Sequence, residues 1–155
     1  MNIEIRKGTK KDIPFALNLV KELATYEKAP NEVEVTIEEM TEWGFGSDKQ
    51  FDFFVATDNN VIVGLALYYY KYSTWKGKCL FLEDIIVTES QRGKGLGKLL
   101  FDKVVQVSKE QKVRRMEWQV LNWNTPAIEF YKKYDATLDG EWVNCKLTNH
   151  QLDKL

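Results

Sequence analysis

The feature that most limits what this chain can fold into is a glycine-rich segment, Arg92 to Gly97, set between a strand pattern and a helix pattern. Before it, residues 78–87 contain the apolar run Leu80-Phe81-Leu82 and predict a long, buried strand. After it, apolar residues recur at helical spacing and predict a helix that ends near Glu110: Leu96, Leu99, Leu100, Val104 and Val107. The chain must therefore contain a strand-turn-helix unit with a flexible backbone at its turn.

This turn is a candidate phosphate cradle. Glycines let backbone N–H groups approach an anion, and a helix start adds unpaired N–H groups and the positive end of its dipole. Arg92, Lys94 and Lys98 add positive charge. The spacing fits neither common nucleotide motif, because the third glycine comes one residue too early for G-x-G-x-x-G and Gly97-Lys98 is followed by Leu99 rather than Ser or Thr. On the glycines alone, a flexible turn with solvated lysines remains an equal alternative.

The remaining patterns place this unit in one mixed α/β domain that spans residues 1–155. The expected order is β-α-α-β-β-β-α-β-α-β, with a short helix at the end. Strands are expected at 3–5, 51–57, 61–72, 78–87, 115–121 and 142–147, and helices at 9–26, from 36 to the glycines at 44 and 46, at 96–110, and from 125. Short turns make the middle three strands antiparallel, and the helix crossover makes the strands that flank the glycine turn parallel.

Capping residues support three of these helix starts. Thr9 precedes Asp12 at first-turn spacing, and Thr36 precedes Glu39 in the pattern of a capping box. Asn124 stands before Thr125-Pro126, which places proline where its missing N–H costs nothing. Asn124 is therefore a candidate helix cap as well as a candidate ligand contact.

Several function classes fit this chain poorly. The formal net charge of −1 argues against a general nucleic-acid binder. No apolar run approaches the roughly 18 residues of a membrane span, and no signal sequence begins the chain, so a cytosolic protein is expected. The two cysteines, Cys79 and Cys145, and the single histidine, His150, offer no metal spacing and no histidine-assisted nucleophile.

Two motifs carry a resemblance to a known family. The glycine turn, read as Arg92-x-x-Gly95-x-Gly97 after a strand of the form L-E-D-I-x-V, is similar to the coenzyme A motif of the GNAT superfamily of N-acetyltransferases. The segment 122–131, NWNTPAIEFY, resembles the W-N-x-x-A-x-x-F-Y block near the end of that superfamily. The resemblance extends along nearly the whole chain and implies the GNAT fold, acetyl-coenzyme A as co-substrate and no metal.

Within the superfamily the chain most resembles the spermidine/spermine and thialysine acetyltransferases. Four segments carry this likeness: 21–27 (KELATYE), 44–46 (GFG), 80–84 (LFLED) and Trp123-Asn124. The chain departs from the family where Tyr134-Asp135-Ala136 replaces the usual Gly-Ala, although Asp tolerates a left-handed backbone. For the family's acidic substrate residue near the last strand, Asp139 and Glu141 are the candidates.

The chemistry of acetyl transfer calls for a base and an acid. A primary ammonium with a pKa near roughly 10.4 must lose a proton before it attacks, at a cost of about 4.6 kcal/mol at pH 7. Glu83 and Asp84 lie within an apolar strand, and as neighbours they are expected to face opposite sides of the sheet. The resemblance assigns the base role to Glu83, directly or through water, and the proton donor to the leaving thiolate to Tyr131. A surface ion pair for Glu83 and a packing role for Tyr131 are the alternatives.

The resemblance also implies the binding residues. For the cofactor these are Ile85, Ile86, Val87, Arg92, Gly93, Lys94, Gly95, Leu96, Gly97, Lys98, Asn124, Ala127 and Tyr131, and for the amine they are Tyr26, Glu27 and Glu83. Glutamates dominate residues 27–42, which near a substrate cleft would concentrate cations and repel acids.

We therefore expect a small cationic amine, a diamine or polyamine, as substrate. Thialysine or another amino-acid side-chain amine, a non-catalytic coenzyme A-binding module, and a DNA-binding regulator are successively weaker alternatives. The resemblance, together with the aromatic residues at 68–70 and 75, also predicts a homodimer.

Overall fold

The computed structural model describes residues 1–155 as two compact units, Met1–Gln119 and Val120–Leu155. The first unit holds the sheet and three of the α-helices, and the second holds the other two. None of the helices has both the length and the apolar character needed to cross a bilayer.

The sheet of the first unit has five strands in the order β1-β2-β3-β4-β5. They are β1 (Ile3–Lys7), β2 (Asp52–Asp58), β3 (Val61–Ser73), β4 (Gly77–Val87) and β5 (Arg115–Trp118). β1 to β4 pair in antiparallel fashion, whereas β4 and β5 are parallel. Both predictions about strand direction are confirmed, because a short turn can only join antiparallel neighbours and the helix between β4 and β5 returns the chain to the same end.

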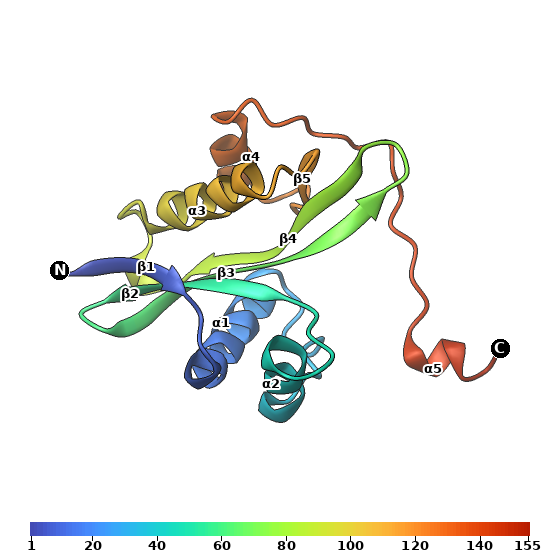
Figure 1. The fold of residues 1–155 in the computed structure, drawn as a ribbon, viewed down its shortest axis with the longest axis horizontal. Helices are drawn as coiled ribbons and strands as arrows, with labels where there is room; N and C mark the ends of the chain where they lie inside the picture. Colours follow the sequence, from blue (N-terminus) through green and yellow to red (C-terminus); the bar gives the residue numbers. More distant parts are fainter. The chain divides into compact units, whose positions relative to one another are not determined.

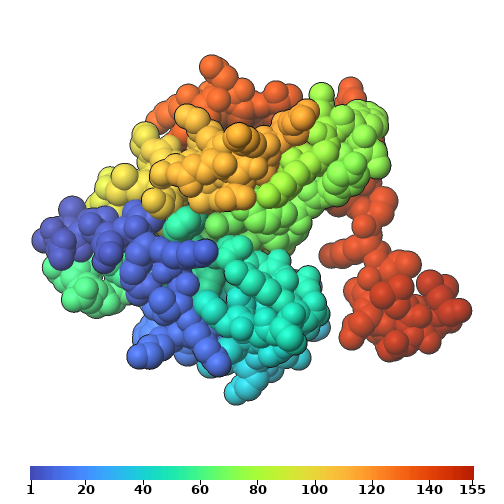
Figure 2. All heavy atoms as spheres, viewed as in Figure 1, coloured from blue at the N-terminus to red at the C-terminus, as the bar shows by residue number.

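Helices cover both faces of this sheet (Figure 1). α1 (Ile13–Tyr26) and α2 (Ile37–Phe45) lie on one face, and α3 (Leu96–Glu110) lies on the other. Single 3₁₀ turns, Lys10–Asp12 and Glu89–Gln91, precede α1 and the glycine turn. The hairpin of β3 and β4 extends past these helices (Figures 1 and 2).

The predicted caps are present in the first unit. Thr9 and Asp12 form a capping box, and Asp12 is also bound by Arg6 at 2.7 Å, which with the hydrogen bonds lowers the pKa of its carboxyl to about 2. At α2, the N–H of Glu39 donates to the Thr36 hydroxyl at 3.1 Å, and the N–H of Thr36 donates to the Glu39 carboxylate at 3.0 Å. Each box satisfies N–H groups that the helix itself leaves unpaired.

Two apolar layers hold the helices to the sheet. Leu17 of α1 and Met40 of α2 are buried with residues of β2 and β3, such as Val55 and Leu65. On the other face, α3 buries its apolar stripe, which includes Leu100, Phe101 and Val104. At roughly 1.5–3 kcal/mol for each large side chain removed from water, these layers fix α1 and α3 firmly against β4, the strand that carries the candidate acids.

The pairing of β3 with β4 contains one irregularity, and it falls at Glu83. Leu67 pairs with Asp84 and Tyr68 pairs with Leu82, so Glu83 is an extra residue on β4 without a partner on β3. A bulge of this kind bends the strand and shifts the alternation of its side chains. Residues before and after Glu83 are therefore out of phase with each other.

The second unit contains α4 (Thr125–Lys132) and α5 (Asn149–Leu152). Asn124 caps α4, since its side-chain oxygen accepts a hydrogen bond from the N–H of Ala127 at 3.4 Å, and proline occupies the first turn as expected. Asp135 has a φ of 55°, so the left-handed turn that the family fills with glycine is kept here by an aspartate.

The predicted last strand is wrong. Trp142 to Leu147 contain no strand, and the sheet ends with β5. An alternating pattern becomes a strand only when a neighbouring edge accepts its hydrogen bonds, and this segment has no place in the ladder. The strand predicted at 115–121 also ends earlier, at Trp118.

Candidate active site

The turn between β4 and α3 has the backbone of an anion cradle. Gly93 and Gly95 have φ values of 77° and 81°, which glycine adopts without strain and most other residues do not. A Cβ at either position would meet no atom within 4 Å, so the space above the turn is open. The first helical hydrogen bond of α3 runs from the N–H of Leu99 to the carbonyl of Gly95. The N–H groups of residues 96–98 precede it and have no partner within the helix, as an anion site requires.

The basic residues of the turn differ in their partners. Lys94 donates to Gln91 at 2.6 Å, and Lys98 pairs with Asp102 at 2.5 Å, both on the surface. The guanidinium of Arg92 is directed to α1 instead: it donates to the carbonyl of Val87 at 2.9 Å and lies 5.1 Å from the ring centre of Tyr26. Arg92 thus joins the start of the glycine turn to the end of α1.

Glu22 of α1 completes this connection. Its carboxylate accepts hydrogen bonds from the Thr88 hydroxyl at 2.9 and 3.1 Å and from the N–H of Glu89 at 3.0 Å, and it lies 3.6 Å from Arg92. We call Glu22, Thr88, Glu89 and Arg92 the α1–loop bridge. Sequence patterns do not reveal this role of Glu22, because its partners lie more than 60 positions further along the chain.

The edge of β4 is open next to the glycine turn. The parallel ladder of β4 with β5 covers only Cys79 to Leu82. Residues 85–87 pair with β3 on one side, and no strand of the sheet pairs with their other side. The backbone groups of these residues, which are predicted to contact the cofactor arm, thus face no strand of the sheet on this side, and the Val87 carbonyl accepts the hydrogen bond from Arg92.

Glu83 lies on β4 with its carboxylate held by a neighbouring strand. The hydroxyl of Tyr69 on β3 donates to Oε2 of Glu83 at 2.9 Å. Burial, and then this hydrogen bond to an anion, raise the pKa of Tyr69 to about 12, so the hydroxyl keeps its proton and remains a donor. This contact replaces the surface ion pair that was the alternative for Glu83.

Glu83 is one of three neighbouring carboxylates. Burial, and then the charge of Glu83, raise the pKa of Glu27, which caps the end of α1. Burial raises the pKa of Asp84 to about 7, with further contributions from Glu83 and Glu27. We call Glu27, Glu83 and Asp84 the acidic cluster. None of the seven ion pairs described within the first unit includes a residue of this cluster.

The expectation that Glu83 and Asp84 face opposite sides of the sheet is wrong. Asp84 lines a pocket together with Leu17 and Val20 of α1, and Glu83 is bound to Tyr69 and acts on Glu27, so both acids lie on the face that α1 covers. The bulge at Glu83 is the physical reason, because it breaks the strict alternation on which the expectation rested. Asp84 is therefore a site residue that the sequence reasoning missed.

The residues predicted from the second motif all belong to the second unit. Tyr131 lies on α4, where its ring contacts Phe130 edge-on at 5.4 Å between centres. Asn124 and Ala127 form the cap at the start of the same helix. Asp139 and Glu141 are exposed, and Asp139 accepts a hydrogen bond from the N–H of Glu141.

Comparisons with known proteins agree with this geometry. The family model described as "Acetyltransferase (GNAT) family" matches residues 17–135. Thialysine N-epsilon-acetyltransferase of Bos taurus is 34% identical over 142 residues, which are 86% of this chain and 84% of the relative. Spermidine/spermine N(1)-acetyltransferase-like protein 1 of Homo sapiens is 33% identical over 140 residues, 86% of this chain but 20% of that protein. Among solved structures, an integron cassette protein from V. cholerae matches with a TM-score of 0.78 at 21% identity, over 99% of this chain and 97% of the other.

Proposed function

This chain belongs to the acetyltransferase (GNAT) family, and on that premise we propose that it transfers acetyl groups to a small cationic amine, a diamine or polyamine. The family uses acetyl-coenzyme A as co-substrate and acts on amines. The observation that supports this substrate class best is the acidic cluster, in which two carboxylates of β4 and one at the end of α1 lie close enough for their charges to add to the effect of burial on the pKa values of Glu27 and Asp84.

The acidic cluster suits a substrate that carries a positive charge. Burial, and then the charges of neighbouring carboxylates, raise the pKa values of Asp84 and Glu27 above their usual range. The anionic form of each side chain is therefore unfavourable at this place. A primary ammonium next to them lowers that cost and is itself bound by charge-assisted hydrogen bonds. Tyr26, the last residue of α1, supplies an aromatic ring at the same end of the helix.

Glu83 is the residue that we propose to take the proton from the bound ammonium. At pH 7 an unassisted amine gives up its proton at a cost of about 4.6 kcal/mol, and a positioned carboxylate lowers this barrier directly or through water. The hydrogen bond from Tyr69 holds the Glu83 carboxylate in one orientation. Tyr131 is proposed as the donor of a proton to the departing sulfur, a role for which its phenol has the right chemistry.

The cofactor site is proposed at the glycine turn and the open edge of β4. Acetyl-coenzyme A supplies an activated acetyl thioester and carries phosphates that need an anion site. The left-handed glycines, the unpaired N–H groups at the start of α3 and the surface cations Lys94 and Lys98 fit such phosphates. The edge of residues 85–87 that no strand of the sheet covers fits the amide-bearing arm. On the resemblance alone, Asn124, Ala127 and Tyr131 are proposed as further cofactor residues.

A second candidate substrate is thialysine or another amino-acid side-chain amine. The name of the Bos taurus relative favours it, since that protein covers most of this chain at 34% identity. The cluster accepts the terminal ammonium of either class equally well, because both present a primary amine on a narrow alkyl chain.

A transfer assay decides between these readings. Purified protein, acetyl-coenzyme A and either putrescine, spermidine, spermine, lysine or thialysine are mixed, and release of free coenzyme A is followed. We expect kcat/KM for at least one diamine or polyamine to exceed that for lysine by more than tenfold. A clear preference for thialysine would favour the second candidate. Binding of coenzyme A without transfer to any amine would instead indicate a non-catalytic module.

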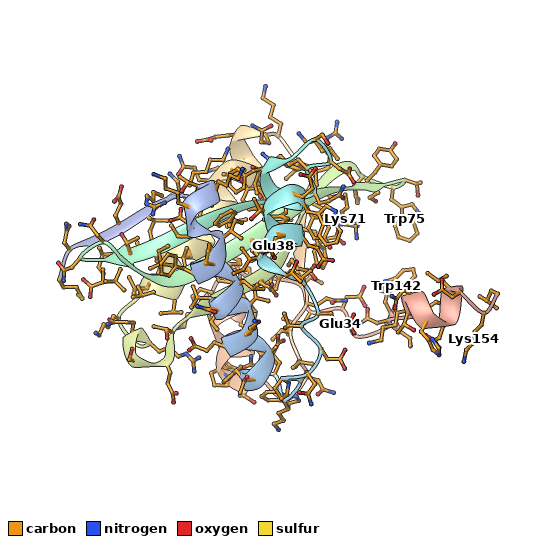
Figure 3. The ribbon with its side chains drawn as sticks, turned by 90° about the horizontal axis from the view of Figure 1, so that it is seen from below. Glu34, Glu38, Lys71, Trp75, Trp142 and Lys154 are labelled. Atoms are coloured by element: carbon orange, nitrogen blue, oxygen red, sulfur yellow. The ribbon has the colours of Figure 1, made fainter.

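We also propose a homodimer. Tyr68 is buried in the first unit and does not serve this role, but Tyr72 and Trp75 at the tip of the β3–β4 hairpin are 76% and 79% exposed. Figure 3 shows the Trp75 side chain projecting from this tip. Two large aromatic groups in water favour a contact with another chain. Light scattering at micromolar concentration is expected to give about twice the monomer mass of 18.1 kDa, and the monomer mass would exclude the dimer.

A further inference from the structure

A pocket of about 250 Å³ lies beside the acidic cluster, between the sheet and the helices α1 and α2. This is the face toward the viewer in Figure 3, where Glu34 marks the segment that joins the two helices. α1 contributes Leu17 and Val20, α2 contributes Met40 and Trp43, and Asp84 lines the pocket from β4. The proposed transfer reaction uses only the carboxylates at this place and leaves the pocket itself without a role.

The lining sets the chemistry of an occupant. Apart from Asp84 and Gln50, every residue that lines the pocket is apolar. Transfer of an ammonium group from water into these apolar surroundings without a partner costs at least several kcal/mol of free energy. The inner part of an occupant must therefore be uncharged. Diamines and polyamines carry a second charge within a few carbons of the first and therefore do not fill this pocket.

The volume sets the size. An engineered apolar cavity of about 150 Å³ holds one benzene molecule. A pocket of about 250 Å³ therefore has room for a phenyl ring with a two-carbon link, or for an alkyl chain of similar bulk. We propose that this pocket binds the apolar tail of a primary monoamine, a second class of acceptor whose ammonium lies at Asp84 next to Glu83.

Charge complementarity fixes the orientation of this ligand. The only carboxylate that lines the pocket is Asp84, and the residue before it on β4 is Glu83, whose carboxylate is held by Tyr69. An ammonium bound between these acids points the tail into the apolar side and leaves its nitrogen beside the proposed base. The inference rests on the proposed amine transfer and adds a subsite that selects for an uncharged tail.

The test compares amines that differ only in the tail. kcat/KM is measured for ethylamine, hexylamine, 2-phenylethylamine and 1,6-diaminohexane with acetyl-coenzyme A. We expect hexylamine and 2-phenylethylamine to exceed ethylamine at least tenfold, and hexylamine to exceed its matched diamine. Val20→Phe fills the pocket and is expected to bring the ratio of hexylamine to ethylamine close to one. Val61→Phe, the same change at a position 63% exposed on β3, serves as control and leaves the ratio unchanged.

A second readout does not depend on catalysis. Trp43 lines the pocket, so saturable binding of hexylamine is expected to change its fluorescence, and Trp43→Phe removes that change. Equal kcat/KM for ethylamine and hexylamine in the wild-type enzyme overturns the inference even while diamines are acetylated. If no amine is acetylated, the proposed function fails, and the fluorescence titration still decides whether the pocket binds an apolar tail.

Discussion

The hydroxyl of Tyr69 donates a 2.9 Å hydrogen bond to the carboxylate of Glu83, across the point where β3 and β4 lose their regular pairing. The bulge leaves Glu83 without a partner in the ladder, and the tyrosine supplies the contact that orients its side chain. A base that must meet a substrate proton in one geometry gains from such a fixed carboxylate.

Removal of the proposed base is expected to have an effect that depends on pH. Glu83→Gln keeps the size of the side chain but cannot accept a proton, so kcat/KM should fall by about 10²-fold near pH 6.5. The loss should shrink as pH rises, because more of the free amine then arrives deprotonated. A pH–rate profile of both proteins checks this, and a loss that stays constant from pH 6.5 to 9.5 would contradict the base role.

The contact from Tyr69 is predicted to contribute less than the base itself. Tyr69→Phe removes only the hydroxyl, and loss of one hydrogen bond to a charged group should lower kcat by about tenfold with little change in KM. Tyr72→Phe is the matched control, since Tyr72 is on the same strand and largely exposed. Equal rates in the two variants would show that Glu83 needs no orientation from β3.

Tyr131→Phe tests the proposed acid. The change keeps the ring and its edge-on contact with Phe130, so the unfolding temperature should stay within a few degrees. Turnover should fall by about 10²–10³-fold, the scale of one general acid, while the affinity for coenzyme A measured by calorimetry stays the same. Near wild-type turnover would leave Tyr131 as a packing residue and remove the proton donor from the mechanism.

Gly95→Glu is expected to abolish most coenzyme A binding. It adds a negative charge at the start of α3 and strains a backbone with a φ of 81°. Gly95→Asn, which tolerates this backbone, should bind with intermediate affinity, and Lys109→Glu at the far end of α3 should bind as the wild type does. Titration calorimetry measures all three, and unchanged affinity in Gly95→Glu would place the phosphates elsewhere.

The acidic cluster makes folding stability depend on pH. Burial raises the pKa of Asp84 from 3.8 to about 7. Between these two pH values the folded chain keeps a proton that the unfolded chain has lost. The free energy of unfolding therefore falls as pH rises through that range. Asp84→Asn should therefore be more stable than the wild type by roughly 2–3 kcal/mol at pH 8 and equally stable near pH 3.5. Urea unfolding at both pH values checks this, with the exposed change Glu38→Gln as control. No difference at pH 8 would contradict the unfavourable burial of the anion.

Local patterns were sufficient for most of the fold. Apolar periodicity and capping residues predicted the helices to within a few residues, because these signals act between positions at most four apart. The turn at Asp135 was also correct, since its left-handed backbone depends on the residue itself. The strand at Trp142 to Leu147 failed because a strand also needs a neighbouring edge, which no local pattern supplies.

The site was predicted less completely for the same reason. The glycine turn and Glu83 follow from the residues and the resemblance, but the role of Asp84 depends on a one-residue bulge that leaves no mark in the sequence. Likewise, the resemblance predicts Arg92 as a phosphate ligand, but nothing in the neighbouring sequence predicts its contacts with Glu22 and Tyr26 on α1. Contacts between distant segments decide which way a side chain turns.

The extra residue in β4 gives this strand two neighbouring acids where a regular strand would present one to the same face. Deletion of Glu83 would leave Leu82 and Asp84 as consecutive residues opposite Tyr68 and Leu67, which is the pairing of a regular ladder. Leu82, now buried, and Asp84, now beside α1, would then keep their sides of the sheet. The bulge is therefore not needed to hold the two halves of the strand in register, and its consequence is chemical: it adds a second carboxylate to the face that α1 covers.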